Sequence, residues 1–267
     1  MKNLFSYLAP IKNLELIYQF ARRDIEAKYR QSWLGLLWLL LSPLLMLIIY
    51  TFVFRHIFQV RWAPADEGNI AFALRLYTGL LIFNVFAECI NRAPSLLLEQ
   101  PHLIKKVVFP LETLAWSSVL ASGIQLFIGS IILLALYSLG IGAPPISALA
   151  LPLIWLPLLP LCLGLSWLLA SIGIFVRDIG QIVSLCMSAL VFLSPVFFPL
   201  EVLPRKVQEW MWLNPLSPIM TQTRTALLQG QWPNWEQVFI SFSTCLFIAV
   251  IGAIIFKRLR EGFSDVI

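Results

Sequence analysis

The stretch Thr113–Val176, TLAWSSVLASGIQLFIGSIILLALYSLGIGAPPISALALPLIWLPLLPLCLGLSWLLASIGIFV, decides the fold, because its 64 consecutive residues carry no charge. A helix needs about 20 mostly apolar residues to cross a bilayer, so this stretch is long enough for two crossings. Its natural break is GIGAPP at 140–145, since glycines and paired prolines do not continue a helix. We therefore predict an all-α membrane protein.

The composition of the whole chain agrees with a membrane location. Of its 267 residues, 59% are hydrophobic and 12% are charged, whereas soluble domains have about 25% charged residues. One soluble core could not bury so much apolar surface, which excludes a soluble globular enzyme. The four cysteines lie far apart and near no histidine cluster, so neither a zinc site nor a disulfide framework is expected.

Four further apolar stretches complete a predicted set of six spans. The least regular one, 69–90, is interrupted by Arg75, Asn84 and Glu88, which are tolerated in a membrane helix only near its ends or against protein. Glu88 and Arg92 are four residues apart, so we expect them to form an ion pair. The predicted spans, within a transmembrane domain of residues 31–257, are 31–54, 69–90, 114–139, 147–176, 179–200 and 237–256.

Six spans place both termini on one side of the membrane. That side then holds 13 of the 19 lysines and arginines, and basic residues concentrate on the cytoplasmic side of membrane proteins. We therefore expect a cytoplasmic N-terminal segment, 1–30, with no cleaved signal peptide, and a cytoplasmic tail, 258–267. We interpret the basic residues behind the net charge of +5 as orienting the protein in the membrane. Because no basic stripe lies on a soluble domain, we expect no nucleic-acid partner.

The N-terminal segment contains an amphipathic helix. Its apolar residues recur at helical spacing opposite a charged face, which predicts a helix lying along the cytoplasmic membrane surface. Two interpretations of its cations stay open: they anchor the helix among lipid phosphates, or they bind a phosphate of the substrate. These cations are Arg22, Arg23, Lys28 and Arg30.

The cytoplasmic segment RAPSLLLEQPHLIKKVVFP, 92–110, is too apolar for a simple connector. We predict a short helix at Ser95–Gln100, ended by Pro101, whose apolar face either docks into another protein or rests on the lipid surface.

The largest outer segment, 194–235, is also too apolar for an open loop. It predicts two helices, at 205–213 and 218–228, joined by a turn at Asn214-Pro215. The helices either re-enter the outer leaflet or form an interfacial aromatic belt. The candidate gate or glycan-binding aromatics are Trp210, Trp212, Trp232 and Trp235.

The sequence lacks the motifs of a nucleotide-hydrolysing enzyme. It has no GxxxxGK[ST] loop and no GxGxxG after a strand. In the predicted topology His56 and His102 lie on opposite sides of the membrane, which weakens the hypothesis of an intramembrane enzyme. We expect a transport subunit that binds no cofactor itself.

Three segments together resemble one family. They are RDIEAKYRQSWLGLLWLLLSPLLMLIIYTFVF at 23–54, LIKKVVFPLE at 103–112 and NPLSPIMTQTRTALLQGQWPNW at 214–235. They are similar to the membrane subunit of ATP-binding-cassette (ABC) exporters of polysaccharides, the group that moves O-antigen, capsule and teichoic-acid chains. The resemblance covers nearly the whole chain.

This resemblance implies a homodimer in the bacterial inner membrane, paired with two copies of a separate ATPase that binds ATP and Mg. The cargo implied is a polyprenyl-pyrophosphate-linked glycan, and channel aromatics would stack on its sugars. The N-terminal helix and the cytoplasmic loop would contact the ATPase. The loop residues expected in this coupling role are Leu96, Leu97, Leu98, Glu99, Leu103, Lys105, Lys106, Phe109 and Pro110.

Three alternatives stay open. A permease for a drug or a lipo-oligosaccharide would share the fold and differ in cargo. An intramembrane transferase would act without an ATPase, and a passive channel would conduct without ATP.

Overall fold

The computed structural model describes residues 5–8, 10–29, 33–58, 68–104, 109–200, 203–211 and 213–263. All regular structure within these residues is helical. Five helical stretches are long and apolar enough to cross a membrane, and they correspond to five of the six spans expected from the sequence. These stretches are Trp38–Ile57, Asn69–Ser95, Glu112–Gly140, Ile146–Phe175 and Trp235–Gly262.

The N-terminal half supplies three of these stretches. Its helices are α1 (Phe5–Leu8), α2 (Leu14–Tyr29), α3 (Trp38–Thr51), α4 (Asn69–Arg92), α5 (Pro101–Ile104) and α6 (Glu112–Gly140). The last turns of the first stretch, Phe52–Ile57, form a π-helix directly after α3. Such wider turns are rare and occur frequently at functional sites.

The C-terminal half contains the other two long stretches and several shorter helices. They are α7 (Leu151–Trp155), α8 (Leu158–Phe175), α9 (Ile179–Leu190), α10 (Arg205–Met211), α11 (Leu216–Leu228) and α12 (Trp235–Leu259). The chain turns at 141–145, as the glycines and prolines there predicted. Pro157 immediately precedes α8 and separates it from α7, because a proline ring cannot extend the preceding helix.

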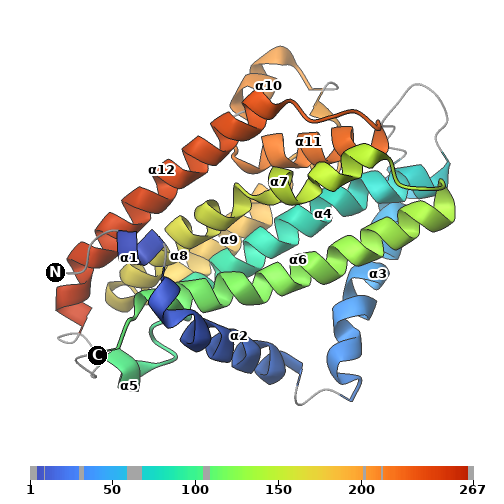
Figure 1. Ribbon diagram of the computed structural model, residues 1–267. Coiled ribbons are helices and arrows are strands. Elements are labelled where there is room, and N and C mark those ends of the chain that lie inside the picture. Colours follow the sequence, from blue (N-terminus) through green and yellow to red (C-terminus); the bar gives the residue numbers. More distant parts are fainter. Residues whose placement is uncertain are drawn as a thin grey trace.

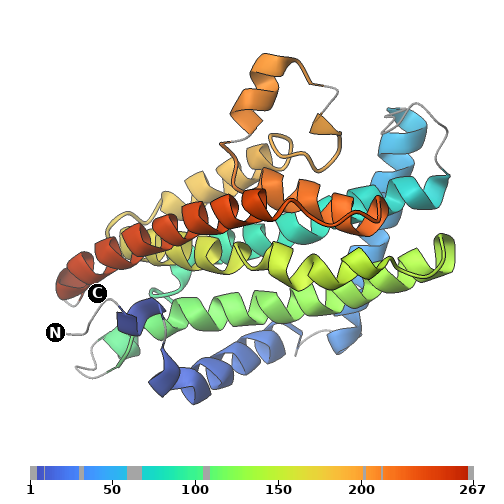
Figure 2. The same cartoon turned by 45° about the horizontal axis from the view of Figure 1, so that its top comes forward.

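Helices α4, α6, α8 and α12 run side by side, while α3 crosses the edge of this bundle (Figure 1). The short helix α10 stands away from the bundle in the second view (Figure 2). At one end, Tyr7 of α1, Leu103 of α5 and Phe256 of α12 share a hydrophobic core. We call this the terminal end. Helices α7 and α11 lie toward the opposite end.

Burial differs sharply between the spans. Helix α4 is apolar on nearly all faces and is buried along most of its length, as expected for the central helix of a bundle. Helix α3 is just as apolar but has a single buried residue, Leu47. A continuous exposed apolar face of this kind needs lipid or another protein to cover it. It includes Leu40, Leu45, Met46, Ile48, Ile49 and Phe52.

The stretch 179–200, expected as the fifth span, is not one long helix. Helix α9 has 12 residues and ends at Leu190, and the chain then continues in turns. The turn residues Ser194 and Val196 are fully buried. Apolar length alone therefore did not predict the conformation of this segment.

Two glycines allow α8 and α12 to approach closely. A Cβ atom added at Gly252 would lie 2.1 Å from the carbonyl oxygen of Gly164, and one added at Gly164 would lie 2.5 Å from the Cα of Ala249. Both obstacles are backbone atoms, which cannot move aside as a side chain can. Small residues commonly permit such contacts between membrane helices.

We predict that Gly252→Val destabilises the protein by separating α8 from α12. Overpacking costs about 1–3 kcal/mol, and a backbone obstacle places this site at the upper end. The matched control is Gly123→Val, because nothing lies within 4 Å of a Cβ atom at Gly123. Thermal unfolding in detergent compares the two variants, and equal melting temperatures would contradict the proposed contact.

Candidate functional site

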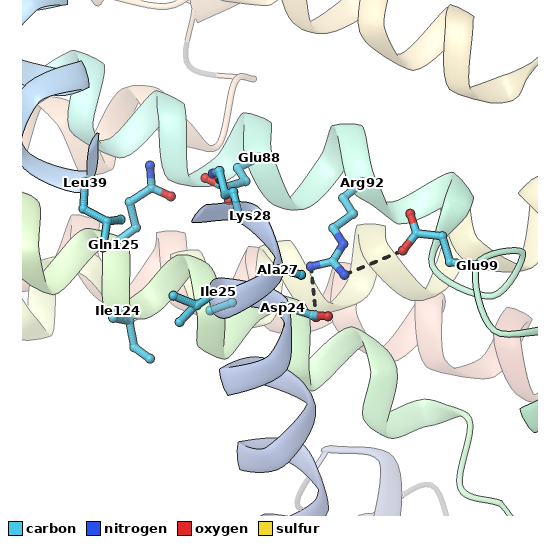
Figure 3. Close-up of a pocket in the computed structure, with 11 residues that line it drawn as sticks. Asp24, Ile25, Ala27, Lys28, Leu39, Glu88, Arg92, Glu99, Ile124 and Gln125 are labelled. Atoms are coloured by element: carbon cyan, nitrogen blue, oxygen red, sulfur yellow. Dashed lines mark hydrogen bonds and ion pairs between the residues drawn. The ribbon is translucent and has the colours of Figure 1, made fainter. Parts of the chain in front are cut away.

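A polar pocket of about 430 Å³ lies where α2 meets α4, α6 and the start of α3 (Figure 3). Its polar lining comes from helices far apart in the sequence, and apolar side chains complete the wall. The polar residues are Asp24, Lys28, Glu88, Arg92, Glu99 and Gln125.

Ion pairs connect the charged side chains of this pocket. Lys28 Nζ lies 2.7 Å from Glu88 Oε1, and Arg92 Nη1 lies 2.9 Å from Asp24 Oδ2. Arg92 Nη2 lies 3.7 Å from Glu99 Oε2, beyond hydrogen-bond distance. The prediction of an ion pair between Glu88 and Arg92 is therefore wrong. Glu88 pairs with Lys28 of α2, and Arg92 pairs with Asp24 of α2 and lies near Glu99 of the loop after α4. Spacing along one helix cannot reveal such partners.

The cations predicted as phosphate ligands occupy different environments. Lys28 lines the pocket. Arg22 is exposed and pairs with Glu26 at 2.7 Å, and this hydrogen bond raises the pKa of Arg22 above its ordinary value. The Arg23 guanidinium lies 4.7 Å from the ring centroid of Phe20. Arg30 lies outside the described residues. The three described cations, Arg22, Arg23 and Lys28, therefore do not form one cluster.

The first part of the loop after α4 differs from its predicted helix. Residues 93–95 form one turn of 3-10 helix and 96–99 form turns, while Pro101 begins α5 instead of ending a helix. Proline suits a first helical position, because the amide hydrogen it lacks would be unbonded there. The helix predicted at Ser95–Gln100 was therefore wrong.

The loop leucines divide into buried and exposed residues. Leu96, Leu97 and Leu103 are buried in the hydrophobic core of the terminal end. Leu98 is 38% exposed, and Glu99 beside it is exposed as well. Leu98 is thus available to a partner, whereas Leu96 and Leu97 stabilise this chain. Glu99 accepts from Ser95 Oγ at 2.7 Å and lines the pocket.

The far end of the loop is held by a buried ion pair. Arg260 Nη1 lies 3.0 Å from Oε2 of Glu112, whose side chain is 1% exposed. Arg260 Nη2 also donates to the carbonyl oxygen of Phe109 at 2.9 Å, and the ring of Phe109 packs edge-on against Phe20 of α2. Pro110 is half-buried beside them, while Lys105 and Lys106 lie outside the described residues.

The segment 194–235, called the outer segment here after its expected side, forms two helices close to the predicted bounds. Asn214 shapes the turn between α10 and α11: its Oδ1 accepts from the backbone amide of Leu216, and its Nδ2 donates to Ser194 Oγ. The side chains of Trp210, Trp232 and Trp235 are exposed. Trp212 lies outside the described residues.

Arg224 connects this outer segment to the centre of the bundle. Its Nη1 donates to the carbonyl oxygen of Pro195 at 2.5 Å, its Nη2 donates to Val196 O at 3.1 Å, and its Nε donates to Arg75 O at 3.2 Å. A Cβ atom at Gly79 would lie 2.7 Å from Nη2, so the absence of a side chain there makes room for the guanidinium.

Polar residues also form exposed stripes on two helices. The α9 positions are spaced three and four residues apart and the two α4 positions seven apart, close to two helical turns, so each set lies on one face of its helix. On α4 they are Asn84 and Asn91, and on α9 they are Gln181, Ser184 and Ser188. In the described part of the chain, no group of three or more histidine, cysteine, aspartate or glutamate side chains is placed to hold a metal ion.

Comparison with protein families identifies the fold. The sequence pattern of the ABC-2 type transporter membrane family matches residues 15–228, most of the chain. The chain belongs to the ABC-2 type transporter family. It is therefore a multi-pass membrane protein of the ABC exporters, consistent with its five long apolar helices.

Individual relatives of this ABC-2 chain are polysaccharide export proteins. It is 25% identical over 255 residues to the O-antigen export system permease protein RfbA of Klebsiella pneumoniae, covering 95% of each chain. It is 27% identical to RfbA of Myxococcus xanthus, covering 94% of each. It is also 25% identical to the polysialic acid transport protein KpsM of Escherichia coli, covering 78% of this chain and 79% of KpsM.

Sequence reasoning missed the long-range contacts of this ABC-2 permease. The candidate site residues did not include Asp24, Glu112 or Arg260. Each of these three residues nevertheless forms an ion pair that holds a candidate segment in place. A carboxylate at the end of an apolar segment is the sequence signal for such a contact, because a carboxylate needs a partner when it is buried. The identity of that partner, 148 positions away for Glu112, is not encoded locally.

We predict that Arg260→Ala lowers the free energy of unfolding by about 2–4 kcal/mol, because it removes a guanidinium from the buried carboxylate of Glu112. Arg258→Ala is the control, since Arg258 is exposed in the last turn of α12, two residues before Arg260. Chemical unfolding in detergent compares the variants. An Arg260→Ala protein as stable as Arg258→Ala would show that the pair contributes nothing.

Proposed function

We propose that this chain is the transmembrane subunit of an exporter that moves a lipid-linked polysaccharide, such as O-antigen, across the inner membrane, driven by a separate ATPase. The observation that carries the proposal is the match of 94–95% of the chain to permeases named for O-antigen export. The absence of a phosphate-binding loop from the sequence supports a separate energy source.

The path of the chain supports six crossings with cytoplasmic termini. Helix α8 ends close to Pro94 at the terminal end, since a Cβ atom at Gly173 would lie 2.3 Å from the Pro94 carbonyl oxygen. Helix α12 starts toward the opposite end (Figure 1). The segment between them must return across the bundle once, and α9 with the turns after it makes this passage. The terminal end then faces the cytoplasm, in agreement with its excess of basic residues.

The polar stripe on α9 supports a translocation path along this helix. Gln181, Ser184 and Ser188 are exposed, and polar side chains at membrane depth usually face protein or a water-filled cavity. A second copy of the chain, covering the exposed apolar face of α3, completes the path in the proposed homodimer.

Helix α11 is proposed to re-enter the outer leaflet. Its side chains are buried on most faces, and two of them bond to neighbouring helices: Trp155 Nε1 donates to Thr223 Oγ1, and Gln222 Nε2 donates to Gln237 Oε1. A non-spanning helix at membrane depth needs this kind of protein surround. The exposed Trp210, Trp232 and Trp235 are proposed to line the glycan exit, where flat rings pack against sugars.

The exposed cations of α2 are proposed to meet the pyrophosphate of the lipid carrier. Arg22 and Arg23 offer planar guanidinium groups suited to phosphate oxygens at the cytoplasmic surface. The exposed Leu98 of the loop is proposed to contact the ATPase together with the segment containing Lys105 and Lys106. Both ends of this loop join helices of the bundle, so a displacement by the ATPase reaches the spans.

The experiment that tests this function is a deletion strain in which lipid-linked polymer is assayed on both sides of the membrane. We predict that polymer accumulates inside the deleted strain and that this chain restores export only with its ATPase. The purified chain alone should hydrolyse no ATP. Export without any ATPase would favour a passive channel, and unchanged polymer distribution in the deletion strain would assign another cargo.

A second experiment tests the coupling role of the loop. We predict that Leu98→Glu reduces export strongly, because losing one buried apolar contact weakens association by about 1.5–3 kcal/mol. His102→Glu is the control, since His102 is exposed in the neighbouring α5. Copurification of the ATPase and polymer export are measured at equal amounts of the chain in the membrane. If Leu98→Glu retains both activities, the coupling contact lies elsewhere, and α2 is the next candidate.

A further inference from the structure

The charges of the pocket between α2, α4 and α6 do not suit a purely anionic ligand. Among the described residues, three carboxylates line it, Asp24, Glu88 and Glu99, against two cations, Lys28 and Arg92. A pyrophosphate bound there would meet an excess of negative charge. A ligand that carries both a cation and an anion would match both kinds of side chain.

The two cations and their carboxylates are arranged as neighbouring acid–base pairs. Lys28 and Glu88 form one pair at 2.7 Å, and Arg92 and Asp24 form the other at 2.9 Å, while Glu99 lies 3.7 Å from the same guanidinium (Figure 3). Glu99 Oε1 accepts from Ser95 Oγ at 2.7 Å, whereas the 3.7 Å between Glu99 Oε2 and Arg92 Nη2 is too long for a direct hydrogen bond. A donor and an acceptor from a ligand can therefore each find a partner of opposite charge.

The rest of the wall is apolar. Ile25, Leu39 and Ile124 line the same pocket, and α2 beside it has exposed apolar residues, Leu14 and Tyr18, as in a helix at a membrane surface. Ile124 lies about 18 Å along α6 from its first residue, so the apolar wall of the pocket extends part-way along this helix. The pocket volume of about 430 Å³ falls within the usual range of small-ligand sites.

We propose that this pocket binds the head group of a zwitterionic phospholipid that carries a primary amine, phosphatidylethanolamine. The amine donates hydrogen bonds to the carboxylates, chiefly Glu99, and the phosphate accepts from Lys28. The apolar wall contacts the beginning of the acyl chains. A bound lipid of this kind would fill the gap between α2 and the bundle, and it is distinct from the transported glycan.

The test measures lipid retention by the purified chain, without ATPase or glycan, so its result is independent of export. The chain is mixed in detergent with equal amounts of phosphatidylethanolamine and phosphatidylcholine. The lipids that stay bound are then identified and quantified by native mass spectrometry. We expect about a tenfold preference for phosphatidylethanolamine, since a charge-assisted hydrogen bond contributes that order of affinity. Mono-, di- and trimethylated amines should bind progressively less as N–H donors are removed.

Variants locate the effect in the pocket. Glu99→Gln should reduce the preference to about one and Lys28→Gln should weaken retention of both lipids. Glu15→Gln and Lys12→Gln are matched controls at exposed positions near the start of α2. The methylated series needs only the wild-type chain, so it gives a result even if a variant fails to fold.

Three outcomes would overturn the proposal. Equal retention of phosphatidylethanolamine and phosphatidylcholine would show that the amine is not recognised. Stronger retention of anionic phosphatidylglycerol would show that the cations dominate the pocket. Displacement of the lipid by soluble phosphoethanolamine would show that the site takes a water-soluble ester instead of a membrane lipid.

Discussion

The packing of α4 inside the bundle determines where the other parts of this permease lie. Its backbone carbonyl at Arg75 accepts from Arg224 of the outer segment, and its Glu88 and Arg92 pair with the N-terminal α2. A helix surrounded by protein can carry such groups at membrane depth, because each is satisfied by a partner instead of lipid. The central helix therefore joins the outer segment, the polar pocket and the loop into one structure.

Two kinds of polar contact act at the two ends of this helix. Toward the outer end, Arg224 bonds to backbone carbonyls, which fixes the turn at Pro195 and Val196 against Gly79. Toward the terminal end, the contacts join side chains of opposite charge. The carbonyl contacts depend on backbone geometry and do not titrate, whereas the ion pairs respond to neighbouring charges and are weakened by salt where they are exposed.

The sequence predicted the features that depend on local composition. The apolar length of five spans, the turn at 140–145 and helices close to 205–211 and 216–228 all follow from residues adjacent in the chain. Features set by distant partners were not predictable in this way. The short α9 followed by buried turns depends on Arg224, and the ion pairs of Glu88 and Arg92 depend on α2, so spacing along one helix gave the wrong pairing.

The loop 92–110, expected on the cytoplasmic side, illustrates the same limit, and its placement matters for the proposed transport. Its leucines are equally apolar, yet Leu97 is buried in the chain's own core and Leu98 remains exposed, a distinction that depends on Trp167 and Phe256 from other helices. Ion pairs hold both ends of the loop: Arg92 lies between Asp24 and Glu99 at the beginning.

At the other end, Glu112 pairs with Arg260 directly after α12. A loop held at two points to different helices cannot shift without moving them or breaking an ion pair. In the proposed exporter, a displacement at Leu98 is therefore transmitted to α2 and α4 through one attachment and to α12 through the other. Because α12 contacts α8 through glycines with no space for adjustment, those two helices move together as one rigid unit.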